Sequence, residues 1–403
     1  MPRRTTRGQA AAAASARRPL FAATIALAMA LGGQAGAQQA CEVKLGALGP
    51  MSGPAAQWGL AMLGAAELAA AEANARNFTV AGRRCTVSVV SYDTRYTAEG
   101  AAAGINNLAS QGVRFVIGPV GSPEVTGAKP VATRHNLLMF ANSYAKNAIG
   151  PQWPLVFHLG PGPSEWAAPI VLMAQQQFGM RSVVVVAPND QGGTDIASVD
   201  AEVYRSLGIT ATEEYYQRGT TNFAPIVTRI LSSRPDAVDT ASSPPGDSGL
   251  IVRQLRQAGF TGPIGHLGGP GTEEIIRVAG GIDVLKNFYW YEVVPTEDPQ
   301  VRAIADEYKR LLGRDAPENT NMWLWVVGAR MTLRAMETAG TTTDTRKVAE
   351  ALRAMPVDDP NVGRGSWAGQ RFFGINQELS LPFGAGLIVD GQNRGVRRIE
   401  VGQ

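Results

Sequence analysis

Signatures of catalysis are scarce in this 403-residue sequence. It has only three histidines, His135, His158 and His266, and their spacing matches no metal site. No G-x-G-x-x-G and no G-x-x-x-x-G-K-S/T stretch occurs, so neither a dinucleotide loop nor a phosphate loop is predicted. We therefore predict no cofactor and no metal, and we predict that the chain is not an enzyme.

One short motif leaves an enzymatic alternative open. Ser143-Tyr-Ala-Lys146 matches S-x-x-K, a nucleophile motif of exported serine hydrolases. Neither S-D-N nor K-T-G accompanies it. An exported hydrolase that uses Ser143 and Lys146 remains the alternative from another functional class.

Cysteine is rare as well, with Cys41 and Cys85 as the only two. Each stands two residues before a valine of a predicted strand. If those strands are parallel neighbours, the sulfur atoms lie at matching heights, and we predict a disulfide between them in an oxidising compartment. Two unrelated thiols are the alternative.

Long apolar runs are also missing. The longest, Leu20–Leu31, is too short to span a bilayer, follows five arginines and precedes Ala35-Gly-Ala37. This order is typical of a secretory signal peptide, so we predict cleavage near Ala37 and a periplasmic protein, by the general or the twin-arginine export route. Without those five arginines the formal charge of +3 falls to −2, and we predict no nucleic-acid partner.

The rest of the chain alternates short apolar strands with helices, which predicts parallel sheets covered on both faces. A Pro- and Gly-rich stretch, 151–165, separates two such series, and helices followed by a β-rich tail complete the chain. We predict an α/β fold of two doubly wound, Rossmann-like lobes joined by a multi-strand hinge, with a ligand cleft between them. The predicted divisions are an N-terminal lobe of residues 42–160 and 293–370, and a C-terminal lobe of residues 161–292 and 371–403.

Polar or Gly-rich breaks follow six of the predicted strands. Carboxyl ends of parallel strands share one edge of a sheet, where open α/β folds bind ligands. Gly, Ser and Asn favour turns in any case, but Trp58, Tyr144 and Trp166 also stand beside these breaks. Trp58 could instead only pack on its own helix, and Ser122 could only cap the next one. The breaks are residues 49–59, 118–122, 141–145, 188–193, 242–248 and 268–272.

Four stretches, 49–59, 116–139, 183–193 and 249–259, resemble the leucine/isoleucine/valine-type periplasmic binding proteins, the solute receptors of ABC importers. The resemblance implies two lobes with three crossovers, a small ligand buried between them and an ABC permease in the inner membrane as partner. We expect a monomer. A sensor of the same fold, which passes closure to a signalling partner, is a second interpretation.

The resemblance also implies a site for an α-amino acid. Ser122 would hold the carboxylate, and a hydroxyl at the position of Ala145 and a backbone carbonyl near Ser143 would complete that half-site. An acid at the position of Gly268 would neutralise the ammonium, and an aromatic ring at Gly192 would cover the ligand. Ala145, Gly268 and Gly192 lack those groups.

These three departures change the expected ligand. A buried ammonium without a counter-charge is costly, so an ordinary α-amino acid is disfavoured unless Asp190, Asp247 or Glu273 substitutes. The glycines leave room for a ring, and the aromatic side chains offer it a face. We predict a small, partly apolar carboxylate, aromatic acids included. The predicted ligand-binding residues are Trp58, Ser122, Ser143, Tyr144, Ala145, Trp166, Gln191, Gly192 and Gly268.

Overall fold

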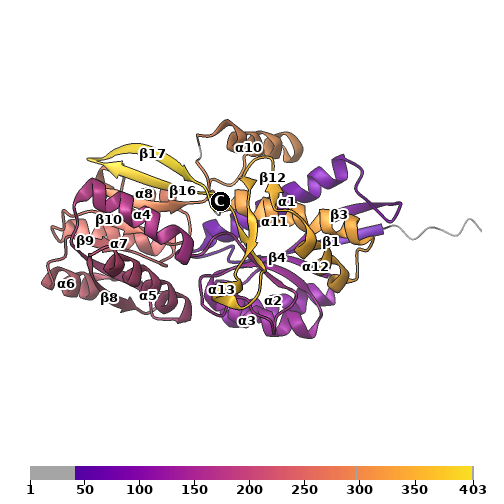
Figure 1. The fold of residues 1–403 in the computed structure, drawn as a ribbon, viewed down its shortest axis with the longest axis horizontal. Helices are drawn as coiled ribbons and strands as arrows, with labels where there is room; N and C mark the ends of the chain where they lie inside the picture. Colours follow the sequence, from indigo (N-terminus) through magenta and orange to yellow (C-terminus); the bar gives the residue numbers. More distant parts are fainter. Residues whose placement is uncertain (1–40, 296, 402–403) are drawn as a thin grey trace, which may run out of the picture. The chain divides into compact units, whose positions relative to one another are not determined.

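A computed structural model describes residues 41–295 and 297–401. The predicted signal peptide lies outside these residues. Two large sheets of mostly parallel strands, each flanked by helices, make up the described part (Figure 1). This confirms the predicted α/β fold. No helix within the described ranges is both long and apolar enough to cross a membrane.

The first sheet has eight strands in the order β14-β15-β6-β5-β4-β1-β3-β2. From β15 to β3 the neighbouring strands are parallel, and β14 and β2 pair antiparallel at the two edges. Every residue of β4 is buried, as expected for a strand covered on both faces. The strands are β1 Cys41–Gly49, β2 Thr79–Val80, β3 Arg83–Asp93, β4 Phe115–Val120, β5 Leu138–Asn142, β6 Val156–Leu159, β14 Ser366–Ala368 and β15 Glu378–Ser380.

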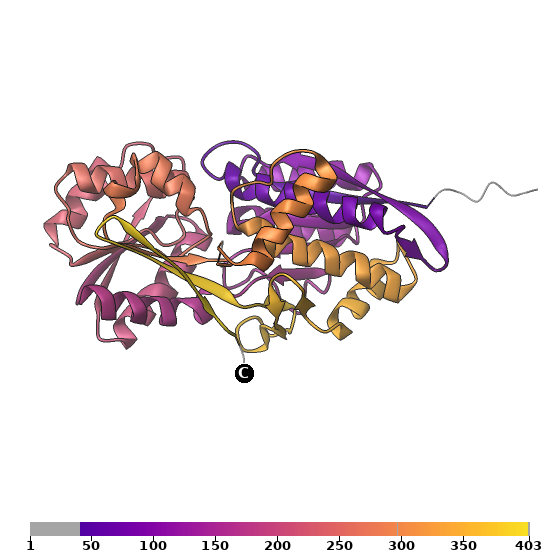
Figure 2. The same cartoon turned by 90° about the horizontal axis from the view of Figure 1, so that it is seen from above.

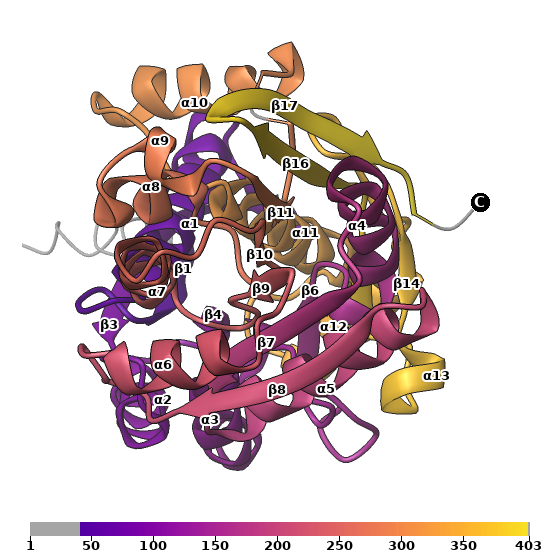
Figure 3. The same ribbon diagram turned by 90° about the vertical axis from the view of Figure 1, so that its left-hand side faces the viewer.

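The second sheet has seven strands in the order β17-β16-β11-β10-β9-β7-β8. Figure 3 shows β16 and β17 extending this sheet beyond β11, with which β16 pairs antiparallel. Asp390 and Gly391 join them in a tight hairpin turn, with φ of 53° and 76°. The strands are β7 Ser182–Pro188, β8 Thr210–Tyr216, β9 Ala237–Asp239, β10 Ile264–His266, β11 Phe288–Glu292, β16 Phe383–Val389 and β17 Gln392–Ile399.

Helices from both ends of the chain cover the first sheet, and among them α11 packs against α1 (Figure 2). We call the first sheet with its helices the first lobe, and the second sheet with its helices the second lobe. The first-lobe helices are α1 Ala56–Ala75, α2 Ala98–Ser110, α3 Ser122–Arg134, α10 Pro299–Leu312, α11 Asn321–Ala339 and α12 Thr345–Ala354. The second-lobe helices are α4 Pro163–Phe178, α5 Gln191–Ser206, α6 Ala224–Ser232, α7 Pro245–Gln257, α8 Thr272–Ala279 and α9 Ile282–Leu285. Short pieces near the C-terminus are α13 Gln370–Phe373 and the hairpin of β12 Asp358–Asp359 and β13 Gly363–Arg364.

The chain passes between the sheets three times, after β6, after β11 and after β15. The last passage differs from the expected boundary at 370/371. Strand β15 belongs to the first sheet, where Leu379 pairs with Leu159 of β6, so the chain leaves that sheet only after Ser380. Strand β15 is only three residues long, too short for its return to the first sheet to show as a pattern in the sequence.

The predicted disulfide between Cys41 and Cys85 is confirmed. The two residues face each other in the parallel pairing of β1 with β3, with their Cα atoms 4.4 Å apart. The matching heights that the sequence suggested therefore follow from the strand register. The bond fastens the first described residue to the sheet.

Candidate ligand-binding site

A small cavity lies where residues after β3, β4 and β5 of the first lobe meet residues after β8, β9 and β10 of the second. Its volume is about 20 Å³, enough for one water molecule. The rings of Trp58, Tyr96 and Tyr144 line it. Among the described residues that line the cavity, Arg218 is the one charged side chain, and none is Asp or Glu. Its polar walls come from Ser122, Asn142, Ser143, Ser242 and Asn321.

Trp58, in the first turn of α1, connects the two lobes. Its indole nitrogen donates to the carbonyl of Pro270 at 2.7 Å. A side chain at Gly269 would meet the indole ring at 2.7 Å, so only glycine allows this approach. The ring is 4 % exposed and also contacts Tyr96, with centroids 5.9 Å apart. Trp58 thus lines the cavity instead of packing on its own helix alone.

Tyr96 reaches the cavity through an unusual backbone path. Arg95 and Tyr96 both have left-handed φ values, 55° and 60°, which L-residues rarely adopt. The Asp93 carboxylate holds this turn by accepting from the amides of Met51 and Arg95, each at 2.9 Å. No sequence motif signals this arrangement, so Tyr96 is not among the residues predicted from the sequence.

Two serines of the first lobe are joined inside the cavity. Gly121, with φ of 99°, caps α3, so Ser122 is the first residue of the helix and does not cap it. The Ser143 hydroxyl donates to the Ser122 hydroxyl at 3.0 Å and accepts from the amide of Ala145 at 3.2 Å. Ala145 is buried and does not line the cavity; its backbone fixes Ser143 instead.

Two buried histidines support the cavity from behind. His158 Nε2 lies 2.7 Å from the Ser143 carbonyl, and its Nδ1 lies 3.3 Å from Glu378. In the second lobe, His266 Nε2 lies 2.8 Å from the carbonyl of Gly269, the residue beneath Trp58. Burial lowers the pKa of His266 to about 4, so the ring is neutral near pH 7. Both histidines are structural here.

The second-lobe glycines were expected to leave room for a ring, and the structure corrects this. A Cβ atom at Gly192 would lie 2.3 Å from the Ser122 side chain, so the lobes touch there. One at Gly268 would lie 2.2 Å from the Ala241 carbonyl, and Gly268 itself does not line the cavity. Gln191 is exposed at the start of α5 and is also outside the lining. These glycines permit close contact and leave no open space.

Tyr144 and Trp166, both predicted, take different roles. Tyr144 lines the cavity, and burial raises the pKa of its hydroxyl, which therefore stays protonated. Trp166 is fully buried, donates to the Pro161 carbonyl at 3.2 Å and packs against Tyr291 with centroids 5.1 Å apart. It meets the Tyr144 ring only edge-on, with centroids 5.7 Å apart, so Trp166 belongs to the core behind the site.

Arg218, which is not among the residues predicted from the sequence, enters the cavity from the second lobe. It lies two residues after β8, and its Nε donates to Asp190 at 2.6 Å. Asp190 in turn caps α5 by accepting from the amide of Gly193 at 2.9 Å. The position of Arg218 thus depends on a residue 28 positions away, which no local pattern could show.

None of the three candidate counter-charges for an ammonium lines the small cavity. Asp190 is paired with Arg218. Asp247 accepts from the Tyr216 hydroxyl at 3.0 Å, and burial raises its pKa to about 6. Glu273 lines a different cavity.

The hydrolase motif is not assembled. Ser143 bonds to Ser122 and Ala145, whereas Lys146 Nζ donates to Ser198 of α5 at 3.2 Å. No hydrogen bond joins Ser143 to Lys146 within residues 41–295 and 297–401. The pair that would activate a serine nucleophile is therefore not formed.

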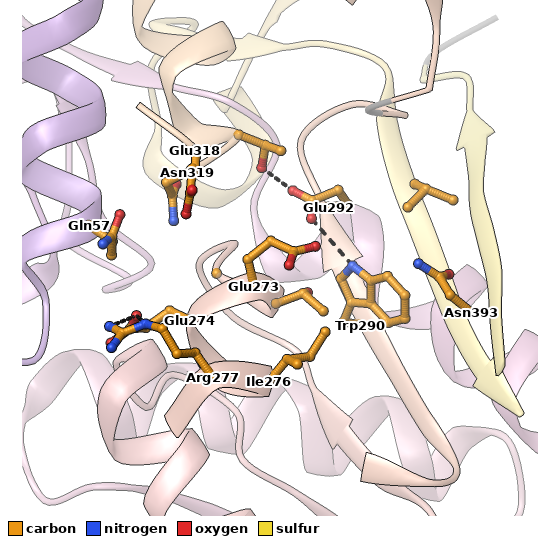
Figure 4. A pocket seen from close by; sticks show the side chains of 14 residues that line it. Gln57, Glu273, Glu274, Ile276, Arg277, Trp290, Glu292, Glu318, Asn319 and Asn393 are labelled. Atoms are coloured by element: carbon orange, nitrogen blue, oxygen red, sulfur yellow. Dashed lines mark hydrogen bonds and ion pairs between the residues drawn. The ribbon is translucent and has the colours of Figure 1, made fainter. Parts of the chain in front are cut away.

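A second, larger cavity of about 270 Å³ lies on the other side of the Gly269–Gly271 loop. Figure 4 shows Glu273 pointing into it beside the Trp290 ring, with Glu292 behind and Glu318 at its rim. Burial raises the pKa of Glu292 to about 7, although hydrogen bonds from Thr320, Val293 and Trp290 oppose this. Its described lining has four glutamates and one arginine, Arg277, which is paired with Glu274, so the excess of negative charge disfavours a carboxylate ligand.

The chain is similar in sequence and in fold to known solute-binding proteins. A family model described as periplasmic binding protein matches residues 42–376. The leucine-, isoleucine-, valine-, threonine- and alanine-binding protein of Pseudomonas aeruginosa is 27% identical over 349 residues, covering 84% of this chain and 89% of that protein. A leucine-binding protein of Thermotoga maritima has a TM-score of 0.75 at 21% identity, covering 89% of this chain and 99% of its own. A solute-binding protein of R. palustris, solved with benzoate, has a TM-score of 0.73 at 16% identity, covering 90% and 98%.

Proposed function

Because the chain belongs to the periplasmic binding protein family, we propose that it is the periplasmic receptor of an ABC importer and that it binds a small, partly apolar carboxylate. Its relatives and its fold are those of non-enzymatic solute-binding proteins. In such receptors two lobes close around a solute, and the closed form is presented to a membrane permease.

One observation carries the choice of ligand: the described lining of the interlobe cavity has three aromatic rings and several polar donors but no carboxylate. The relatives named above for leucine bind an α-amino acid, whose ammonium needs a negative partner when it is buried. Here that partner is missing from the described lining, while Ser122, Ser143 and Arg218 favour an anion. The R. palustris protein of the same fold holds benzoate, an aromatic ring with a carboxylate.

Binding such a ligand requires the lobes to move apart first. The present cavity admits about one water molecule, and Ser122 rests on Gly192 while Trp58 rests on Gly269. A ring and a carboxylate therefore enter only when these contacts separate. The ligand then has to stabilise the closed state by more free energy than the interlobe contacts that it replaces.

A thermal-shift screen tests the proposal. Leucine, valine, benzoate, phenylacetate and succinate are each added to the protein expressed from its full sequence. A ligand at 100 times its Kd adds about 2.7 kcal/mol of stability, so a true ligand gives a clear shift in Tm. We expect the largest shifts with the aromatic acids. Shifts with leucine or valine alone would contradict the proposed ligand class and would leave the receptor function in place.

A further inference from the structure

Arg218 of the second lobe reaches across to the first lobe. Its guanidinium carbon lies 4.8 Å from the centroid of the Tyr96 ring, a cation–π distance. Tyr96 is held in place by the left-handed turn that Asp93 fixes. Arg218 and Tyr96 line the same small cavity as Ser122 and Ser143. The guanidinium therefore sits directly between the two lobes.

Two of the three guanidinium nitrogens already have a partner. Nε and Nη2 each lie 2.6 Å from Asp190 Oδ2, while Asp190 Oδ1 accepts from the amide of Gly193. Asp190 thus fixes the orientation of Arg218, and both of its carboxylate oxygens are hydrogen-bonded. The remaining nitrogen, Nη1, is buried and has no hydrogen-bond partner among the described residues.

A buried donor of a charged group is costly to leave unpaired. No carboxylate of the described lining can serve it, and Asp247, the next acid nearby, accepts from Tyr216. No described residue provides an acceptor for Nη1, which leaves an atom of a ligand or a bound water. A carboxylate is the group that matches a guanidinium best, because its charge and its planar oxygens suit the donors.

We propose that Arg218 is the anion-binding residue of this site. Its Nη1 donates to one oxygen of the ligand carboxylate, and the Ser122 hydroxyl, which accepts from Ser143, donates to the other. This inference rests on the proposed receptor function and adds the residue that sets its specificity. Since Arg218 belongs to the second lobe and Ser122 to the first, one carboxylate would hold both lobes together. A neutral amide of the same shape would not.

The experiment compares acids with their neutral amides. The pairs are benzoate with benzamide, phenylacetate with phenylacetamide, and 3-methylbutanoate with its amide, measured by thermal shift and calorimetry. We expect the unchanged protein to bind at least one acid about 10- to 100-fold more tightly than its amide, which is the range for a hydrogen bond to a charged group. Arg218→Gln should remove that preference, and Arg218→Lys, which keeps the charge without the fork, should retain part of it.

Arg229→Gln is the matched control. Arg229 also lies in the second lobe and pairs with a carboxylate, Glu214, at 2.9 Å, but it is outside the cavity lining. It should leave the acid preference unchanged. Urea unfolding of each variant without ligand separates loss of binding from loss of folding.

The remaining outcomes contradict either the role of Arg218 or the proposed ligand class. Equal binding of acids and amides, or an acid preference that survives in Arg218→Gln, would overturn the role of Arg218 while the protein remained a receptor for small apolar solutes. Binding of leucine or valine alone would overturn the proposed ligand class and this inference together. If no acid binds at millimolar concentration, Nη1 pairs with an ordered water instead, and the inference is wrong.

Discussion

Two cavities lie on either side of the Gly269–Gly271 loop, and they differ in both size and charge. The larger, about 270 Å³, is lined by Glu273, Glu292 and Glu318. The smaller, about 20 Å³, has a guanidinium, two linked serine hydroxyls and three rings. Volume alone would select the larger one. The chemistry of the walls favours the smaller cavity for an acid. The guanidinium of Arg218 has a donor without a partner among the described residues, and the polar side chains around it come from both lobes.

Removing the aromatic wall tests this comparison most strongly. Trp58→Ala should weaken binding of the acid by about 100-fold, as expected when a central aromatic contact is lost. Trp290→Ala, the matched change in the larger cavity, should leave the affinity within about 3-fold. Calorimetric titration with the best acid of the screen measures both. If Trp290→Ala has the larger effect, the ligand occupies the acid-lined cavity and the comparison is reversed.

The charge of the larger cavity should depend on pH near neutrality. The pKa of Glu292 is about 7 in the folded protein, against an ordinary value of 4.5, so the folded state binds more protons between these values. Stability linked to Glu292 is therefore fully present below pH 4.5 and is lost as pH rises through 7. Glu292→Gln should be more stable than the unchanged protein at pH 8, by on the order of 2 kcal/mol.

At pH 5 most of this advantage should be lost, because the Glu292 carboxyl is then neutral in the folded state and only a small difference from the unfolded state remains. Urea unfolding at the two pH values provides the measurement. The same stability difference at pH 5 and pH 8 would show that Glu292 does not titrate in this range.

Removing the single hydroxyl of Ser122 should cause the smallest change in affinity for the acid. Ser122→Ala removes one donor to the carboxylate and should weaken acid binding by about 10-fold. Thr272→Ala is the counterpart in the larger cavity, where the Thr272 hydroxyl is buried without a partner among the described residues. It should not change acid binding. Similar losses for both variants would argue against a specific carboxylate contact at Ser122.

The sequence could place Trp58, Ser122, Ser143 and Tyr144 near a site because all four follow the ends of predicted parallel strands. That rule depends only on strand direction, so it survives without knowledge of packing. It could not separate Tyr144 from Trp166. The Trp166 ring turns away because its nitrogen bonds to Pro161 and its face meets Tyr291, contacts that exist only in the folded core.

Tyr96 and Arg218 could not be predicted from the sequence for a related reason. Each lies in the cavity because a carboxylate holds its neighbourhood: the nearby Asp93 for the turn at Tyr96, and the distant Asp190 for the guanidinium of Arg218. A salt bridge over 28 residues leaves no periodic or motif signal. Gly192 was expected as an open position and instead carries a contact, since a sequence shows the absence of a side chain but not what fills its place.

The contact of Ser122 with Gly192 also bears on how strongly a solute must bind. In this conformation the protein fills its own cleft, because one lobe's serine rests on the other lobe's backbone and Trp58 rests on Gly269. Every solute therefore competes with the protein itself. The free energy of these interlobe contacts sets a minimum affinity, and solutes that bind more weakly cannot displace the contacts and enter the cleft.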